Sequence, residues 1–189
     1  MAQELATDAE ISSLVAAIER TDSDDDAAVN ELLRRYPQDP RLHFMLGSIL
    51  AGKGRAIEAH RAMSQAVELA PGFALARYQL GFFELTSGEP ERALSTWGPL
   101  LAAPRDNYLR VFVEGMTHLI RDEFAEAIER FQAGIALNRE NPPMNNDIQL
   151  LIGECRKLQD RTSGLSGDDE DVSATALLLG RFGANRTLQ

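Results

Sequence analysis

An interval of 34 residues organises the middle of this 189-residue sequence. Three columns of residues repeat at this interval, two of small side chains and one of large side chains. The columns are Gly47, Gly81 and Gly115; Ala59, Ala93 and Ala127; and Met63, Trp97 and Phe131. A fixed period of this length is the signature of repeat architectures, in which each unit buries its apolar face against its neighbours. The sequence therefore favours a stack of similar units over a single irregular core.

The order of small and large residues within one unit predicts a pair of antiparallel helices. A glycine in the first helix and an alanine in the second let the two helices approach closely, and the large residue four positions after the alanine fills the groove between them. The segments 52–54, 87–90 and 121–123 mark where the first helix of a unit ends. No stretch alternates with period two, so we expect no sheet.

These columns resemble the tetratricopeptide repeat family, whose pattern combines L-G, A-x-x-x-F and a final proline. Leu46-Gly47 and Leu80-Gly81 match it, whereas Glu114 stands where leucine is usual. The resemblance covers residues 40–141 as three repeats, 40–73, 74–107 and 108–141. It implies an all-α fold, a right-handed α-solenoid of antiparallel helix pairs, with a degenerate N-terminal repeat before the three clear ones and a C-terminal capping helix after them.

The helical pattern divides the chain into expected elements. We expect helices near 9–20, 25–36, 40–52, 56–70, 74–86, 90–102, 107–121 and 124–138, and a capping helix within 142–159 with one apolar face. Residues 1–39 form an acidic N-terminal segment that contains the degenerate repeat. Residues 160–189 are expected to be a flexible acidic linker followed by an apolar tail.

In the resembling family the first helix of each repeat lines a concave groove. The corresponding positions here are unusually apolar, and aromatic residues recur at the fifth position of each repeat. The predicted partner-binding groove consists of Phe44, Tyr78, Phe82, Leu85, Phe112, Met116 and Leu119. Such a patch suits a peptide or an amphipathic helix. The alternative is that these side chains pack against adjacent repeats or the capping helix and contact no partner.

The C-terminal tail contains an apolar motif after a polar, acidic stretch. Leu177, Leu178, Leu179 and Phe182 are predicted to form a docking segment for another protein or for the groove of this same chain. The alternative is an unused tail that folds loosely on the nearest surface.

Neither charge nor motifs favour chemistry or nucleic-acid binding. The net charge of −10 offers no basic surplus for displacing counterions from a phosphate backbone. The acidic run 22–26 lacks the glycine and glutamate that a calcium loop requires at its sixth and twelfth positions. His43, His60 and His118 are expected to be surface or packing residues, and Cys155 a small apolar residue of the capping helix. We therefore expect no enzyme, no metal and no cofactor.

Three functions remain open. The first is a non-catalytic adaptor that binds a segment of a partner protein in the groove. The second, implied by the resemblance, is a small acidic chaperone of the type III export kind that masks apolar cargo segments. The third is a structural module that self-associates. With no signal peptide and no apolar run long enough to span a bilayer, a cytoplasmic location without membrane contact is expected.

Overall fold

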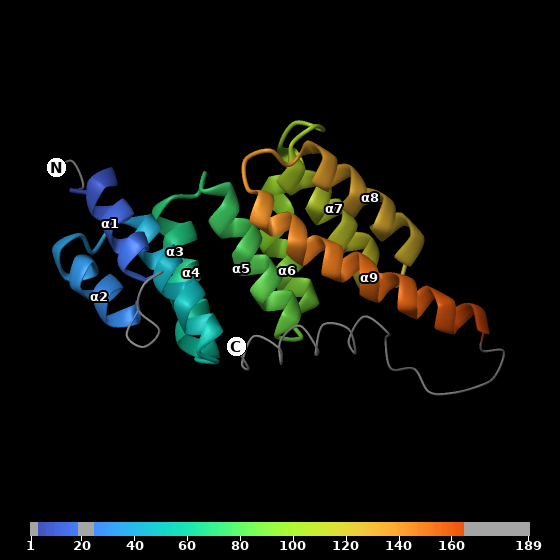
Figure 1. Ribbon diagram of the computed structural model, residues 1–189, viewed down its shortest axis with the longest axis horizontal. Coiled ribbons are helices and arrows are strands. Elements are labelled where there is room, and N and C mark those ends of the chain that lie inside the picture. The colour runs from blue at the N-terminus through green and yellow to red at the C-terminus, as the bar shows by residue number, and fades with distance from the viewer. Residues whose placement is uncertain (1–3, 19–24, 165–189) are drawn as a thin grey trace. The chain divides into compact units, whose positions relative to one another are not determined.

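The computed structural model describes residues 4–18 and 25–164 (Figure 1). The described chain divides into two compact units, one that ends at Leu80 and one that begins at Gly81. The boundary falls inside one helix, and each unit is described by itself below. The predicted tail motif of Leu177, Leu178, Leu179 and Phe182 lies outside the described residues, as does the acidic segment 19–24.

The first unit consists of paired helices. They are α1 (Asp8–Ile18), α2 (Asp25–Arg35), α3 (Pro40–Gly52), α4 (Ala56–Leu69) and the first half of α5 (Ala74–Thr86). α1 packs on α2, α2 on α3, and α3 against α4 along most of its length (Figure 1). The side chain of Asp39 caps α3 by accepting from Arg41 N, and Pro40 occupies the first turn, where its missing N–H costs nothing.

The second unit continues the same pattern. It holds the end of α5, α6 (Pro90–Trp97), a 3₁₀ helix η1 (Gly98–Ala102), α7 (Tyr108–Ile120), α8 (Phe124–Leu137) and α9 (Pro142–Gly164). α7 packs against α8, and α8 against α9. The predicted apolar face of the capping helix is confirmed, because Ile148, Leu151, Ile152 and Cys155 are all buried. None of the described residues is in a strand, and the predicted all-α fold of helix pairs is confirmed.

The three repeated glycines stand where the paired helices meet. A Cβ built on Gly47 would lie 2.6 Å from Met63 Cγ, and one built on Gly115 would lie 2.5 Å from the Phe131 ring. On Gly81 the same atom would lie 2.3 Å from Trp97 Nε1. Real Cβ atoms do not come this close to a neighbour. Each glycine is therefore a notch that receives the large residue of the same repeat, as the sequence pattern predicts.

Two helical glycines give a matched pair of substitutions. Gly115→Ala is expected to destabilise the chain by about 1–3 kcal/mol, because the new methyl group overlaps the buried Phe131 ring. Gly153→Ala in α9 meets nothing within 4 Å and is expected to stabilise by about 0.5–1 kcal/mol, since alanine is the better helix former. Urea unfolding of both variants tests this, and equal midpoints would contradict it.

The predicted helix over 90–102 is wrong in its second half. The α-helix ends at Trp97, and Gly98 N donates to Ser95 O three residues back, as in a 3₁₀ turn. Pro99 explains the change: it has no N–H to donate to Ser95 O, and its ring would clash with that carbonyl in an α-helix. The capping helix starts at Pro142, a residue suited to the first turn of a helix, and is longer than predicted because it continues past Gln159 to Gly164.

Candidate interaction surface

The structure places the α7 part of the predicted groove in the core of the second unit. Phe112, Met116 and Leu119 are 0% exposed. The Phe112 ring fits against Gly134 of α8, where an added Cβ would lie 2.4 Å from its Cδ1 atom. The ring of Tyr108 packs edge-on against it, with 5.9 Å between the ring centroids. Phe112, Met116 and Leu119 therefore pack α7 into the interior of the second unit.

The α5 part of the predicted groove is also buried. Tyr78, Phe82 and Leu85 are 3%, 7% and 1% exposed. The same helix carries a buried carboxylate, Glu84, whose Oε2 accepts from Thr96 Oγ1 at 2.6 Å and whose Oε1 lies 3.2 Å from Arg92 Nε. α5 is thus tied to α6 by both apolar and polar contacts, and its predicted groove residues are part of the packed interior.

On α3 the predicted groove residue is partly exposed. Phe44 is half-buried, while Ser48 and Gly52, one and two turns further along the same side of the helix, are exposed. Phe73, which lies just before α5, packs on Phe44 with 5.3 Å between the ring centroids and 60° between the ring planes. We call these four residues, Phe44, Ser48, Gly52 and Phe73, the α3 face. It combines two partly exposed aromatic rings with two small, exposed residues.

Phe73 is not among the predicted groove residues, and of the seven predicted ones Phe44 alone is not buried. Phe73 follows Pro71-Gly72 in a turn between helices and belongs to no repeated column. Its one readable signal was a large apolar residue directly before a helix start, a position from which it can pack back onto the preceding repeat.

The three histidines each have a local partner. His43 Nε2 lies 2.8 Å from Pro37 O, His60 Nδ1 lies 3.5 Å from Ser64 Oγ, and His118 Nδ1 lies 2.6 Å from Glu123 Oε2. The acidic partner of His118 was not anticipated from the sequence spacing. His43 thus contacts the segment before α3, and His118 contacts the residue before α8. His60 contacts the next turn of α4.

Burial and ion pairing shift the pKa values of Cys155 and Asp26. Burial raises the pKa of the Cys155 thiol to about 11, so the thiolate needed for nucleophilic attack is scarce at neutral pH. Asp26 pairs with Lys53 and lies 3.0 Å from Arg55 Nη1. The hydrogen bond from Lys53 is the main reason that the pKa of Asp26 is lowered, with the positive charges of Lys53 and Arg55 acting in the same direction against the effect of burial.

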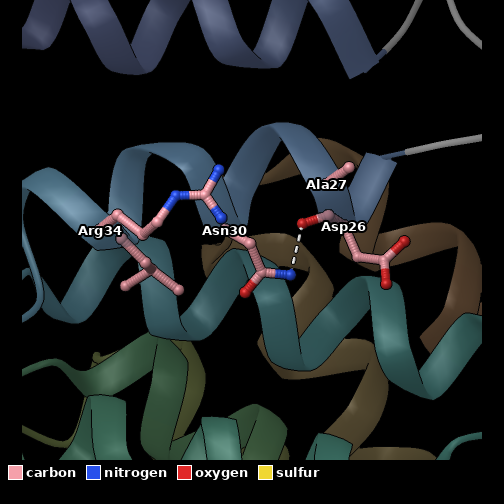
Figure 2. Close-up of a pocket in the computed structure, with 5 residues that line it drawn as sticks. Asp26, Ala27, Asn30 and Arg34 are labelled. Carbon is pink, nitrogen blue, oxygen red and sulfur yellow. Dashed lines mark hydrogen bonds between the residues drawn. The ribbon is translucent and has the colours of Figure 1, made fainter.

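A shallow, open hollow lies over α2 (Figure 2). Its lining comes from one side of that helix: Asp26, Ala27, Asn30, Leu33 and Arg34. Asn30 Nδ2 donates to Asp26 O at 2.7 Å, and Arg34 pairs with Glu31, so the polar groups of the hollow are engaged within α2 or with the α3–α4 turn. The hollow therefore offers no concentrated charge to a ligand.

Within residues 4–18 and 25–164, no three His, Cys, Asp or Glu side chains come together in a way that could hold a metal ion. In the described part of the chain, no helix is both long and apolar enough to cross a membrane.

Solved structures of MamA, a protein of the tetratricopeptide type, are similar to this chain in fold. MamA 41-end from Desulfovibrio magneticus RS-1 superposes with a TM-score of 0.58 at 17% identity, covering 94% of this chain and 93% of that one. The MamA RS-1 ArsTM double mutant gives a TM-score of 0.55 at 16% identity, covering 81% of this chain and 96% of that one. No family model matches the sequence, and no curated protein does. The likeness shows a helical-repeat fold of the tetratricopeptide type.

Proposed function

We propose that this chain is a non-catalytic adaptor that binds a peptide or an amphipathic helix of a partner protein at the α3 face. One observation carries the proposal: Phe44 stays partly exposed on a helix where the repeat pattern places ligand contacts, and the partly exposed Phe73 packs beside it. Aromatic side chains supply large contact area at low entropic cost and are enriched among the residues that dominate binding energy.

The other predicted groove residues take a supporting part in this proposal. Tyr78, Phe82, Leu85, Phe112, Met116 and Leu119 fill the interior of α5 and α7, so direct contact with a partner is assigned to Phe44 alone among the seven. The tail motif of Leu177, Leu178, Leu179 and Phe182 is proposed as an internal competitor for the same face. Deletion of residues 172–189 is then expected to raise affinity for a partner peptide, because a tethered competitor has a high effective concentration.

A charge placed on the α3 face tests the proposal without removing core atoms. Ser48→Arg puts a long cation beside Phe44, and Ser48 is exposed, so the fold is expected to tolerate it. Binding of a co-purified partner should fall by about tenfold or more, because an apolar ligand would have to desolvate the guanidinium. Quantitative mass spectrometry of the captured partner, with thermal unfolding as a check on folding, measures the effect.

The matched control is Gln132→Arg, which adds the same charge at an exposed position of α8. It should leave partner recovery unchanged. Equal recovery with both variants would show that the α3 face does not bind the partner.

A further inference from the structure

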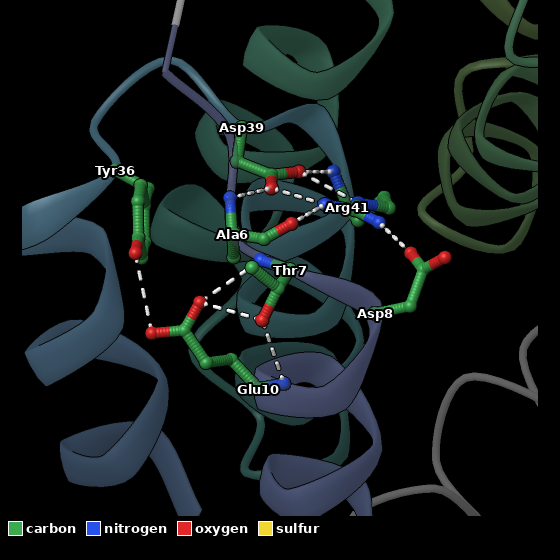
Figure 3. A network of polar contacts seen from close by, with 7 residues as sticks. All are labelled: Ala6, Thr7, Asp8, Glu10, Tyr36, Asp39 and Arg41. Atoms are coloured by element: carbon green, nitrogen blue, oxygen red, sulfur yellow. Dashed lines mark hydrogen bonds and ion pairs between the residues drawn. The ribbon is translucent and has the colours of Figure 1, made fainter.

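An exposed carboxylate lies at the start of α3, at one end of the α3 face (Figure 3). Arg41 stands three residues before Phe44, on the same side of the helix. Its Nη1 atom lies 2.9 Å from Asp8 Oδ1, and the side chain of Asp8 is 98% exposed. Among the described residues Asp8 has no other partner, so its second oxygen is available to a ligand.

The guanidinium of Arg41 is already matched by acids. Its Nε donates to Asp39 Oδ1 at 3.0 Å, and its Nη2 lies 2.7 Å from Asp39 Oδ2 and also donates to Ala6 O. Asp39 is 0% exposed and so cannot contact a partner itself. Two acids share one base in the group of Asp8, Asp39 and Arg41. The group therefore carries one net negative charge, and that charge is presented to solvent at Asp8.

The N-terminal network fixes the position of Asp8, the first residue of α1 (Figure 3). Thr7 and Glu10 form a capping box, in which Thr7 N donates to Glu10 Oε2 at 2.9 Å and Glu10 N donates to Thr7 Oγ1 at 3.2 Å. The other oxygen of Glu10 accepts from Tyr36 Oη at 3.2 Å, which fastens this turn to the residue after α2. Asp8 thus has a defined place beside the start of α3.

The opposite end of the α3 face carries no surplus charge. Lys53 and Arg55, which follow α3, pair with Asp26 and Glu58, so that two bases are matched by two acids. On the side of Asp8 the surrounding sequence adds to the negative charge, because residues 1–39 contain ten acidic and three basic residues. The α3 face is therefore negative at the start of the helix and neutral at its end.

We propose that the partner of the α3 face is a basic amphipathic peptide, which packs apolar side chains on Phe44 and Phe73 and pairs a lysine or arginine with Asp8. This inference rests on the proposed function and names the class of its partner. The net charge of −10 attracts a basic segment during encounter and repels an acidic one. The aromatic rings supply the apolar contact. Asp8 sets the direction of the peptide, since one end of the face alone is negative.

Selection from a random library tests the partner class. Peptides about 16 residues long, roughly four helical turns, are displayed on phage and bound to the immobilised full chain. Peptides that bind the natural chain but neither Ser48→Arg nor Ser48→Glu depend on the α3 face, and the opposite charges of the two variants remove a bias of sign. These peptides should be enriched both in apolar residues and in lysine and arginine over the unselected library.

Charge reversal at Asp8 then separates the two kinds of contact. Selection on Asp8→Lys should lose the enrichment in basic residues and keep the enrichment in apolar ones. Glu126→Lys, at an exposed position of α8, makes the same change in net charge and should keep both. Asp8→Asn, which removes the charge without reversing it, should weaken the basic enrichment and serves if the lysine disturbs α1.

Affinities of one selected peptide complete the test. Replacing its basic residues by glutamine should weaken binding to the natural chain by about two- to fivefold, the scale of an exposed ion pair, and should not weaken binding to Asp8→Lys. If no peptide depends on Ser48, the proposed function fails and this inference with it. Peptides that depend on Ser48 but lack basic enrichment, or an enrichment that is equal on Asp8→Lys and Glu126→Lys, overturn this inference alone.

Discussion

Trp97→Ala is expected to lower the free energy of unfolding by about 3–5 kcal/mol, the usual cost of deleting a large buried aromatic side chain. Trp97 is 0% exposed and is, with Ala93, one of two buried residues of the short helix α6. Its indole fills the notch at Gly81, so its loss leaves a cavity between α5 and α6. Trp97 is the only tryptophan of the chain, so unfolding in urea is best followed by far-ultraviolet circular dichroism. A loss below about 1 kcal/mol would contradict this role, since that is the scale of a surface substitution.

A double-mutant cycle isolates the notch itself. Gly81→Ala in the natural chain should cost about 1–3 kcal/mol, because the new methyl group overlaps a rigid, buried ring. In the Trp97→Ala background the same substitution should cost little, because the cavity accepts the methyl group. We expect a coupling energy within the usual range of about 0.5–3 kcal/mol for residues in contact. Additive effects would show that the two positions do not act on one another.

The helix pairs could be predicted from the sequence because both partners of the closest contact repeat. A glycine and the large residue that packs against it are separated by the same interval in every repeat. The contact of Gly47 with Met63 and that of Gly81 with Trp97 are therefore two instances of the same helix packing. The break of α6 was also readable, since Gly98-Pro99 stands inside the predicted helix. The repeat pattern favours a continuous helix here, but the missing N–H of Pro99 ends the α-helix at Trp97.

The accessible surface could be predicted only in part. Helical periodicity assigns Phe44 and Phe112 to equivalent sides of their helices, but it does not say which neighbour covers that side. Phe112 is covered because Gly134 of α8 admits its ring, whereas on α3 the same side carries Ser48 and Gly52 and stays open. Periodicity reports where a side chain points along one helix. Burial depends on every element packed around it.

The network at the N-terminus escaped prediction for a different reason. Its central contacts join Ala6 to Asp39 and Arg41 across more than thirty residues of sequence. Two local signals were nevertheless present, the capping box of Thr7 and Glu10 and the capping aspartate before Pro40. Each predicts a helix start. Neither predicts that the two helix starts meet.

Asp39→Ala is expected to destabilise the chain by about 2–4 kcal/mol, because one side chain both caps α3 and binds the N-terminal segment. Its carboxylate is 0% exposed and accepts from Ala6 N, Arg41 N and the Arg41 guanidinium at 2.7–3.0 Å. The substitution leaves those donors without their acceptor.

Asp8→Ala is the control, because it removes the other acid that pairs with Arg41. Asp8 is 98% exposed, so its loss should have no measurable effect on urea unfolding.

The pH dependence of the unfolding free energy, compared between the natural chain and Asp39→Ala, tests whether the charge of Asp39 is responsible. Burial by itself would raise the pKa of Asp39, but hydrogen bonds from Arg41 and Ala6 and the charge of Arg41 outweigh it and hold the pKa below the ordinary value of 3.8. A carboxyl whose pKa is lower in the folded chain binds protons more readily when unfolded. Its stabilisation is therefore fully present above about pH 5 and is lost as the pH falls through the folded-state pKa.

The difference in unfolding free energy between the natural chain and Asp39→Ala should therefore be constant near neutral pH and shrink below about pH 4. Glu10, Asp26 and Glu58 also have lowered pKa values, so both proteins lose stability in acid, and the subtraction removes this shared part. Urea titrations at several pH values supply the measurement. A difference that stays the same into strong acid would mean that the shape of Asp39, and not its charge, holds the N-terminal segment against α3.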